Sequence, residues 1–331
     1  MTFSLLSPKN RMINIVLNDH SIRYVELKQT NPPISQKWHE RFLPPGIIRD
    51  GKITDFDSLA NIMDQCIDEW KIRKRSVRFL VPDSLVIIRK VSIPAEIQED
   101  EIRGHLYLEF GSSIHLPFED PVFDFFSLAE NRNTKEILLF AAPEKYVMEY
   151  AELFTSLKLI PKAADISALA LYRLYYHLDF ASHKDHLLTL QFDLTSVNMC
   201  IFEESVPYVM RHFPIPFEIE RWEINKDRAG KFDLKYIGDA NELAYQFEDI
   251  LKEMNKLMDF YRYSLNNGKK EVTKLLLIGD HPLLLAIFEE MKDRLDIPVV
   301  SISLDNIQKG KTGNIPTKFL LSLGLALKEV Q

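Results

Sequence analysis

Hydrophobic residues recur with two different periods along this chain of 331 residues. Short apolar runs bounded by Pro, Gly, Asn or Asp are typical of buried strands, whereas apolar positions three or four residues apart are typical of amphipathic helices. The two kinds of segment alternate through both halves of the chain. This alternation predicts an α/β protein.

The clearest helix is predicted over residues 241–265, where apolar residues from Leu243 to Tyr261 form one continuous stripe. Asp239 and Glu242 resemble a capping box at its start. Residues 84–158 read as strand, helix, strand, strand and helix, with the first helix predicted over 96–110. That order is compact enough for an inserted subdomain. The polar segment 218–238 shows no clear period.

Two segments, 13–27 and 187–202, each read as a strand, a short turn and a second strand. Their spacing is that of a hairpin that clasps a phosphate. The residues at the key positions are hydrophobic or amide-bearing, where acids and glycines would be needed. This combination indicates the architecture of a nucleotide-binding fold without its chemistry.

Composition narrows the classes of partner. The 41 basic and 48 acidic residues give a formal charge of −7, which argues against nucleic acid or an anionic membrane surface as the main partner. Cys66 and Cys200 are far apart and form neither a disulfide framework nor a zinc spacing. No signal peptide or membrane span is apparent, so we expect a cytoplasmic protein.

Several longer segments resemble one family in their order and spacing. The most specific are PGIIRDGKI at 45–53, VIIRKVSIP at 86–94, LPFED at 116–120 and LGLAL at 323–327. On these segments the chain resembles the PilM family of type IV pilus assembly proteins and, through it, the cell-division ATPase FtsA. The resemblance extends over nearly the whole chain.

The resemblance implies an actin-like (ASKHA) two-domain fold with an inserted subdomain of the FtsA/PilM type. The first domain would cover residues 11–180, with the inserted subdomain at about 84–158, and a C-terminal helix at 316–330 would complete it. The second domain would cover residues 185–312.

The first phosphate loop departs from the family pattern, which resembles GIDIGSxSVK. Val16 replaces the acid that helps to position Mg²⁺ and water, and Asn18 replaces the turn glycine. Ser21 is retained, and Arg23 stands in place of the lysine. The loop therefore lacks the acid and the open backbone that a magnesium-bound phosphate needs.

The second loop departs as well. Gln191 replaces an acid and cannot supply the negative charge that a hard cation prefers. Asp193 replaces a glycine, and its side chain crowds and repels a phosphate. Gly279 survives at the adenosine site, but Asp280 stands where its neighbouring glycine should be.

At about 1–3 kcal/mol for each lost contact, about four such losses would take micromolar nucleotide binding beyond millimolar. We therefore expect a pseudo-ATPase with no catalytic residue, no metal site and no cofactor, whose nucleotide-site residues are vestigial. If the alignment shifts by a residue or two, Asp19 and Asp193 become the functional acids. The chain would then be an Mg²⁺-ATP-binding ATPase that polymerises. A sugar-kinase-like enzyme is a weaker third alternative, and fold alone does not choose among them.

The resemblance implies a non-catalytic scaffold that is held at the inner membrane only through its partner, and it leaves a homo-oligomer possible. The partner would be a PilN-like bitopic membrane protein, whose N-terminal cytoplasmic peptide would lie in a groove between the first and the inserted subdomain. An extended peptide gains backbone hydrogen bonds from a strand edge and pockets for alternate side chains. The groove residues carried over from the family are Arg89, Val91, Ile93, Glu109, Pro117, Phe118 and Phe125.

Overall fold

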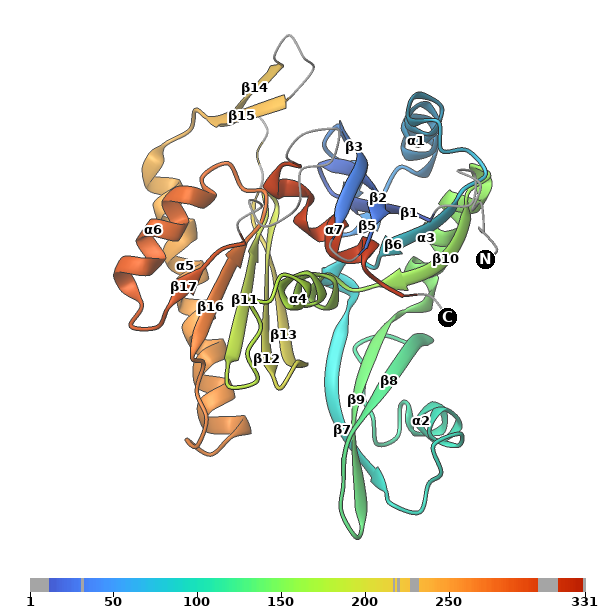
Figure 1. Ribbon diagram of the computed structural model, residues 1–331, viewed down its shortest axis with the longest axis vertical. Coiled ribbons are helices and arrows are strands. Elements are labelled where there is room, and N and C mark those ends of the chain that lie inside the picture. Colours follow the sequence, from blue (N-terminus) through green and yellow to red (C-terminus); the bar gives the residue numbers. More distant parts are fainter. Residues whose placement is uncertain are drawn as a thin grey trace, which may run out of the picture.

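The computed structural model describes residues 12–30, 33–216, 218, 221–226, 232–302 and 315–329. Two five-stranded sheets form two lobes, and a smaller three-stranded sheet projects from the first lobe (Figure 1). Strands and helices alternate in both lobes, as the hydrophobic pattern predicts.

The sheet of the first lobe begins with an antiparallel meander and is extended by two strands parallel to the first one. The first two strands of the meander correspond to the strand, turn and strand predicted over residues 13–27. In spatial order the strands are β10 (Ile160–Asp165), β6 (Ser76–Leu80), β1 (Ile13–Asn18), β2 (Ser21–Gln29) and β3 (Ile34–Phe42). A short ribbon of β4 (Ile48–Arg49) and β5 (Lys52–Ile53) follows β3.

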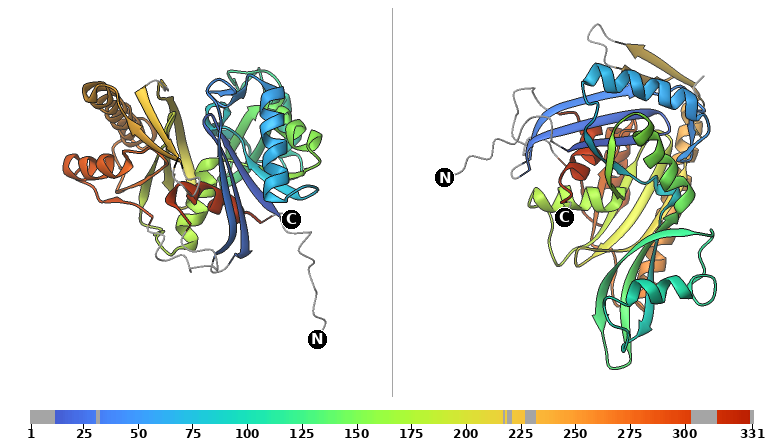
Figure 2. Two further views of the ribbon diagram at one scale, coloured as in Figure 1. Left: turned by 90° about the horizontal axis from the view of Figure 1, so that it is seen from above. Right: turned by 90° about the vertical axis from the view of Figure 1, so that its right-hand side faces the viewer.

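Helices cover both faces of this sheet. On the outer face, α1 (Phe56–Trp70) and α3 (Glu144–Ser156) pack on the strands in one buried cluster. The Asp55 side chain caps α1 by accepting a hydrogen bond from the Ser58 amide at 3.0 Å. On the inner face lie α4 (Ser167–His177) and α7 (Leu320–Ala326), preceded by the turn Thr317–Phe319. Figure 2 shows α4 and α7 between the two lobes.

The second lobe has a central pair of strands that are buried on both faces, which explains their nearly continuous apolar sequence. In spatial order its strands are β13 (Val206–Pro214), β12 (Ser196–Glu203), β11 (His186–Phe192), β16 (Lys274–Ile278) and β17 (Val299–Val300). Its outer face is covered by α5 (Ala240–Asp259) and α6 (Leu284–Arg294).

Two expectations for the second lobe need correction. The long predicted helix is α-helical only to Asp259 and continues as a π-helix over Phe260–Leu265. The polar segment without a clear period contains a hairpin of β14 (Trp222–Lys226) and β15 (Phe232–Tyr236). Asp239 caps α5 as expected, but the Glu242 carboxylate pairs with Arg221 and Tyr236.

The small sheet has the order β7 (Ile87–Pro94), β9 (Thr134–Pro143) and β8 (Pro121–Glu130), and α2 (Ile102–Glu109) covers one face. The turn Asp83–Leu85 leads into it. The helix predicted over 96–110 begins only at Ile102, because residues 96–101 form turns in which the Gln98 amide donates to Glu101. The elements keep the predicted order of strand, helix, strand, strand and helix.

The last helix of that series, α3, packs on the first lobe. Tyr150, Leu153 and Phe154 lie in the same buried cluster as Phe79 of β6. The α2 side of the small sheet has its own buried cluster, drawn from residues 91–141. The predicted domain limits at residues 11, 312 and 330 lie outside the described residues.

One free edge of the small sheet belongs to β8. The Arg103 guanidinium of α2 donates to the Phe123 carbonyl at 2.9 Å and lies over the Phe123 and Phe125 rings. It also pairs with Asp124. Across the described part of the chain, no helix has both the length and the hydrophobicity needed to cross a bilayer.

Candidate functional site

The two predicted phosphate hairpins face each other across the cleft between the lobes. The hairpin of β1 and β2 turns at Asp19 and His20, and the hairpin of β11 and β12 turns near Asp193. A cavity of about 740 Å³ lies between them and is lined by both lobes. The structure therefore brings together the segments that the sequence singled out.

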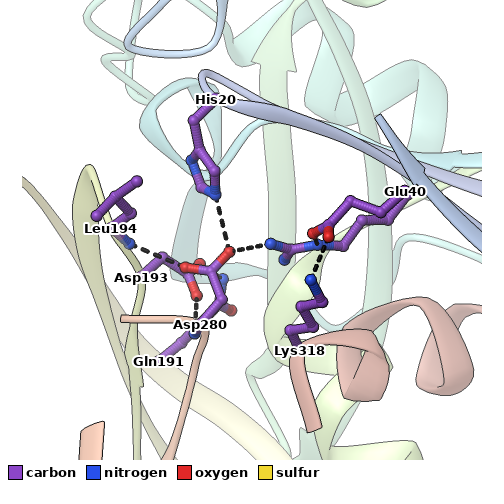
Figure 3. A network of polar contacts seen from close by, with 8 residues as sticks. His20, Glu40, Gln191, Asp193, Leu194, Asp280 and Lys318 are labelled. Carbon is purple, nitrogen blue, oxygen red and sulfur yellow. Dashed lines mark hydrogen bonds and ion pairs between the residues drawn. The ribbon is translucent and has the colours of Figure 1, made fainter. Parts of the chain in front are cut away.

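The centre of the site is the buried carboxylate of Asp280, which directly follows Gly279 at the end of β16 (Figure 3). Asp280 Oδ2 lies 2.5 Å from Arg23 Nη2 and 2.9 Å from His20 Nε2, both in the first lobe. Asp280 Oδ1 accepts a hydrogen bond from the Leu194 amide at 2.9 Å. A side chain of the protein thus connects the two hairpins.

Arg23 has a second partner on its own lobe. Its Nε donates to Glu40 of β3 at 2.9 Å, and Glu40 also pairs with Lys318 just before α7. Burial by itself would lower the pKa of Arg23, but Asp280 and Glu40 raise it above its usual value. Burial would likewise raise the pKa of Asp280, but the charges of Arg23 and His20 hold it well below its usual range. Arg23 and Asp280 are therefore both ionised.

Asp193 behaves differently from Asp280. Burial, together with the neighbouring charge of Asp280, raises the pKa of Asp193 to about 8. Asp193 Oδ1 accepts from the Asp280 amide at 3.2 Å, and Oδ2 contacts the Gln191 side-chain amide. A 180° rotation of that amide would present the unpartnered Gln191 Oε1 to a protonated Asp193. Near pH 7 the Asp193 carboxyl therefore carries little negative charge when no cation is bound beside it.

The carboxylate of Asp19, in the turn of the first hairpin, also has hydrogen-bond partners within the protein. Asp19 Oδ2 accepts from the Asp50 amide at 2.6 Å, and Oδ1 accepts from the Gly51 amide at 3.0 Å. Two consecutive backbone amides of this kind form an anion site, and the Asp19 carboxylate fills it. Among the described residues, no group of three or more His, Cys, Asp or Glu side chains could hold a metal ion.

Gly279, taken as a remnant of an adenosine site, has a structural reason to be glycine. Its φ is +142°, and a Cβ there would lie 1.9 Å from the Phe192 carbonyl oxygen. The close contact between the ends of β16 and β11 requires glycine with or without nucleotide. Ser21 is fully buried and its Oγ has no hydrogen-bond partner, while Asn18 lines the cavity.

The residues predicted to form a partner groove gather on the α2 side of the small sheet. Ile93 is only 2% exposed, and Val91, Phe118 and Phe125 are partly buried against the same cluster. The other three lie at the surface or near it. Arg89 is exposed and donates to the His115 carbonyl, Pro117 is exposed, and Glu109 is half-buried and accepts from Ser113 Oγ.

Sequence reasoning missed three members of the charged network, which are His20, Glu40 and Lys318. His20 lies at a variable position of the first phosphate loop, whereas Glu40 and Lys318 belong to no local motif and are 278 positions apart. One signal was present in the sequence. An arginine at the lysine position and an aspartate at the glycine position are complementary changes, and the two side chains form an ion pair.

Comparison with known proteins identifies the family of this chain. The family described as type IV pilus assembly protein PilM matches residues 15–201. The chain belongs to the PilM family. The structural similarity to solved proteins extends beyond residues 15–201.

The chain is similar to a solved structure titled "PilM-PilN type IV pilus biogenesis complex", with 20% identity, 97% of this chain and 98% of that chain covered, and a TM-score of 0.72. A more distant likeness is to the ethanolamine utilization protein EutJ from Carboxydothermus hydrogenoformans, at 11% identity, with 97% and 90% coverage and a TM-score of 0.52. With the two five-stranded sheets, these likenesses confirm the actin-like fold expected of a PilM-family protein.

Proposed function

We propose that this PilM-family protein is a cytoplasmic scaffold of a type IV pilus assembly complex and that it binds a PilN-like membrane protein without hydrolysing ATP. The single observation that carries the second part is the buried contact between Arg23 and Asp280. It links the two phosphate hairpins beside the cavity that lies between them.

The electrostatics of the cleft support this proposal. A bound Mg²⁺-nucleotide needs a free acid for the metal and open backbone amides for the phosphates. Here Asp280 is paired with Arg23, Asp19 is bound to the Asp50 and Gly51 amides, and the pKa of Asp193 is raised to about 8. Each of these three acids is therefore already paired or largely uncharged.

The partner is proposed from family membership and from the solved complex, whose title names PilM together with PilN. The bound segment would be the N-terminal cytoplasmic peptide of the PilN-like protein, lying against the α2 side of the small sheet. Arg89 and Pro117 are the exposed members of the predicted groove, so a peptide can reach them without disturbing the buried cluster. Membrane association would then be indirect.

Calorimetric titration with a PilN-type N-terminal peptide tests the proposal. We expect binding to the wild-type protein and at least tenfold weaker binding to Arg89→Met, which keeps the apolar stem but loses the charge, a change of about 1.4 kcal/mol. Phe126→Ala is the matched control, because Phe126 is 55% exposed and lies one position from Phe125, on the opposite face of the small sheet.

Two results would count against this site. If Phe126→Ala weakens binding and Arg89→Met does not, the peptide lies on the other face of the small sheet. If the wild-type protein gives no heat and no competition with a labelled peptide, this chain does not bind the N-terminus of a PilN-like partner.

A further inference from the structure

The two lobes share an apolar contact on one side of the cleft. Leu171 and Leu174 of α4 lie in the same buried cluster as Cys200 and Phe202 of β12. The Tyr172 ring stacks on Phe202 with 4.4 Å between ring centroids. Figure 2 shows α4 between the two sheets. Apolar contacts of this kind are non-directional, so they hold the lobes together but do not by themselves fix the angle between them.

The charged contacts between the lobes occur at the hairpins, and an uncharged one joins β12 to α4, where Asn198 Nδ2 donates to Ser167 Oγ at 2.9 Å. Arg23 Nη2 and His20 Nε2 of the first lobe both reach Asp280 Oδ2 of the second, at 2.5 and 2.9 Å. These side chains are at most 5% exposed. A further pair, His212 Nε2 to Asp50 Oδ1 at 3.1 Å, also joins the lobes, but its aspartate is 54% exposed.

Burial decides which of these contacts matters for the geometry of the cleft. An exposed pair is screened by water and costs little to separate. Separating buried partners leaves charges without compensation in a poorly solvated place, which is strongly unfavourable. Arg23 also pairs with Glu40 of its own lobe, and Asp280 accepts a hydrogen bond from the Leu194 amide of its own lobe. Because of these second contacts, neither side chain can reorient freely when the lobes move apart.

We infer that Arg23, His20 and Asp280 form an inter-lobe latch that holds the two lobes at one fixed separation with no ligand in the cleft. The latch connects the same two hairpins that a bridging nucleotide would connect. Lobe closure in this chain is therefore set by its own side chains. The inference is independent of any pilus partner.

Distances between spin labels on the two lobes test the latch directly. Gln65 of α1 and Asn255 of α5 are exposed, and Gln65→Cys with Asn255→Cys provides two labelling sites. The native Cys66 and Cys200 are buried, so the label goes to the introduced cysteines. We expect one narrow distance distribution in the otherwise wild-type protein, unchanged by Mg²⁺-ATP. A broad distribution without ligand, or one that narrows when Mg²⁺-ATP is added, overturns the inference.

Two latch variants then test its cause. Arg23→Met and Asp280→Asn should each broaden the distribution toward longer distances while the circular dichroism spectrum is retained. Arg294→Met is the matched control, because it breaks an ion pair with Glu248 inside the second lobe and should change nothing. Latch variants that match this control overturn the inference. If a latch variant does not fold, His20→Phe is the substitute, because it removes only the contact between His20 and Asp280. A smaller broadening of the distance distribution is expected for it. No broadening in that folded variant contradicts the latch.

Discussion

Among single residues, the neighbouring acids Asp193 and Asp280 differ sharply in charge although a hydrogen bond links them. Asp280 faces Arg23 and His20 and is ionised. Asp193 faces an amide and the charge of Asp280, and its pKa is raised to about 8. The protein therefore keeps one negative charge where two would repel each other.

The raised pKa of Asp193 predicts that this residue lowers the stability of the folded protein as the pH rises. Between about pH 4 and pH 8 the unfolded chain releases a proton that the folded chain retains, so the free energy of unfolding falls as the pH rises. We expect Asp193→Asn, which cannot ionise, to be more stable than wild type by about 1–3 kcal/mol at pH 8. The difference should shrink toward pH 4 in urea unfolding curves.

The control for this experiment is Asp249→Asn, since the Asp249 side chain is 74% exposed on α5. Its stability should follow the wild-type pH curve. If the Asp193→Asn curve also runs parallel to wild type, Asp193 is ionised in the folded protein and the cleft carries two negative charges.

The substitutions at this site could be predicted from the sequence one by one, but their pairing could not. Val16, Arg23 and Asp193 each occupy a position within a short motif, and local spacing identifies them. Glu40 and Lys318 meet only because α7 returns to the first lobe, which no local pattern shows. Long-range ion pairs are consequences of the fold, so they become visible only after the fold is known.

For the secondary-structure elements, too, the local sequence predicted the element but not how it packs. Short apolar runs bounded by turn residues predicted the strands of the small sheet, but not which face of β8 would be buried. Phe123 and Phe125 face α2, while Phe126 points away and is 55% exposed. Since a shift of one residue exchanges the faces of a strand, a groove assigned from sequence alone is sensitive to the smallest error in register.

The contact between α4 and α7 depends on one glycine. A Cβ at Gly324 would lie 2.0 Å from the Ala170 carbonyl oxygen, and Arg173 donates to the Gly324 carbonyl at 2.9 Å. We expect Gly324→Ala to force the helices apart and to lower the free energy of unfolding by about 1–3 kcal/mol, measured in urea.

Gly104 in α2 provides the comparison, because a Cβ added there would meet no atom within 4 Å. Gly104→Ala should leave the packing unchanged and stabilise the protein by about 0.5–1 kcal/mol through helix propensity. Equal effects of the two substitutions would show that α7 does not need the close contact.

For the whole molecule, the pairing of the acids around the cleft predicts that nucleotide has no effect on stability. A ligand that binds only the folded state at one hundred times its dissociation constant stabilises by about 2.7 kcal/mol. We expect millimolar Mg²⁺-ATP to leave the melting temperature of the wild-type protein unchanged within about 1 °C. A rise of several degrees, or an ATP-dependent increase in light scattering, would favour the polymerising ATPase over the scaffold.

Arg103 has a consequence for how the small sheet meets other chains. An uncovered edge strand is a template for aggregation, because its free carbonyls and amides can recruit a neighbour. On β8 the Phe123 carbonyl already receives the Arg103 guanidinium, which also shields two aromatic rings. An intruding strand must first displace this side chain at Phe123, so Arg103 hinders strand addition along this part of the β8 edge.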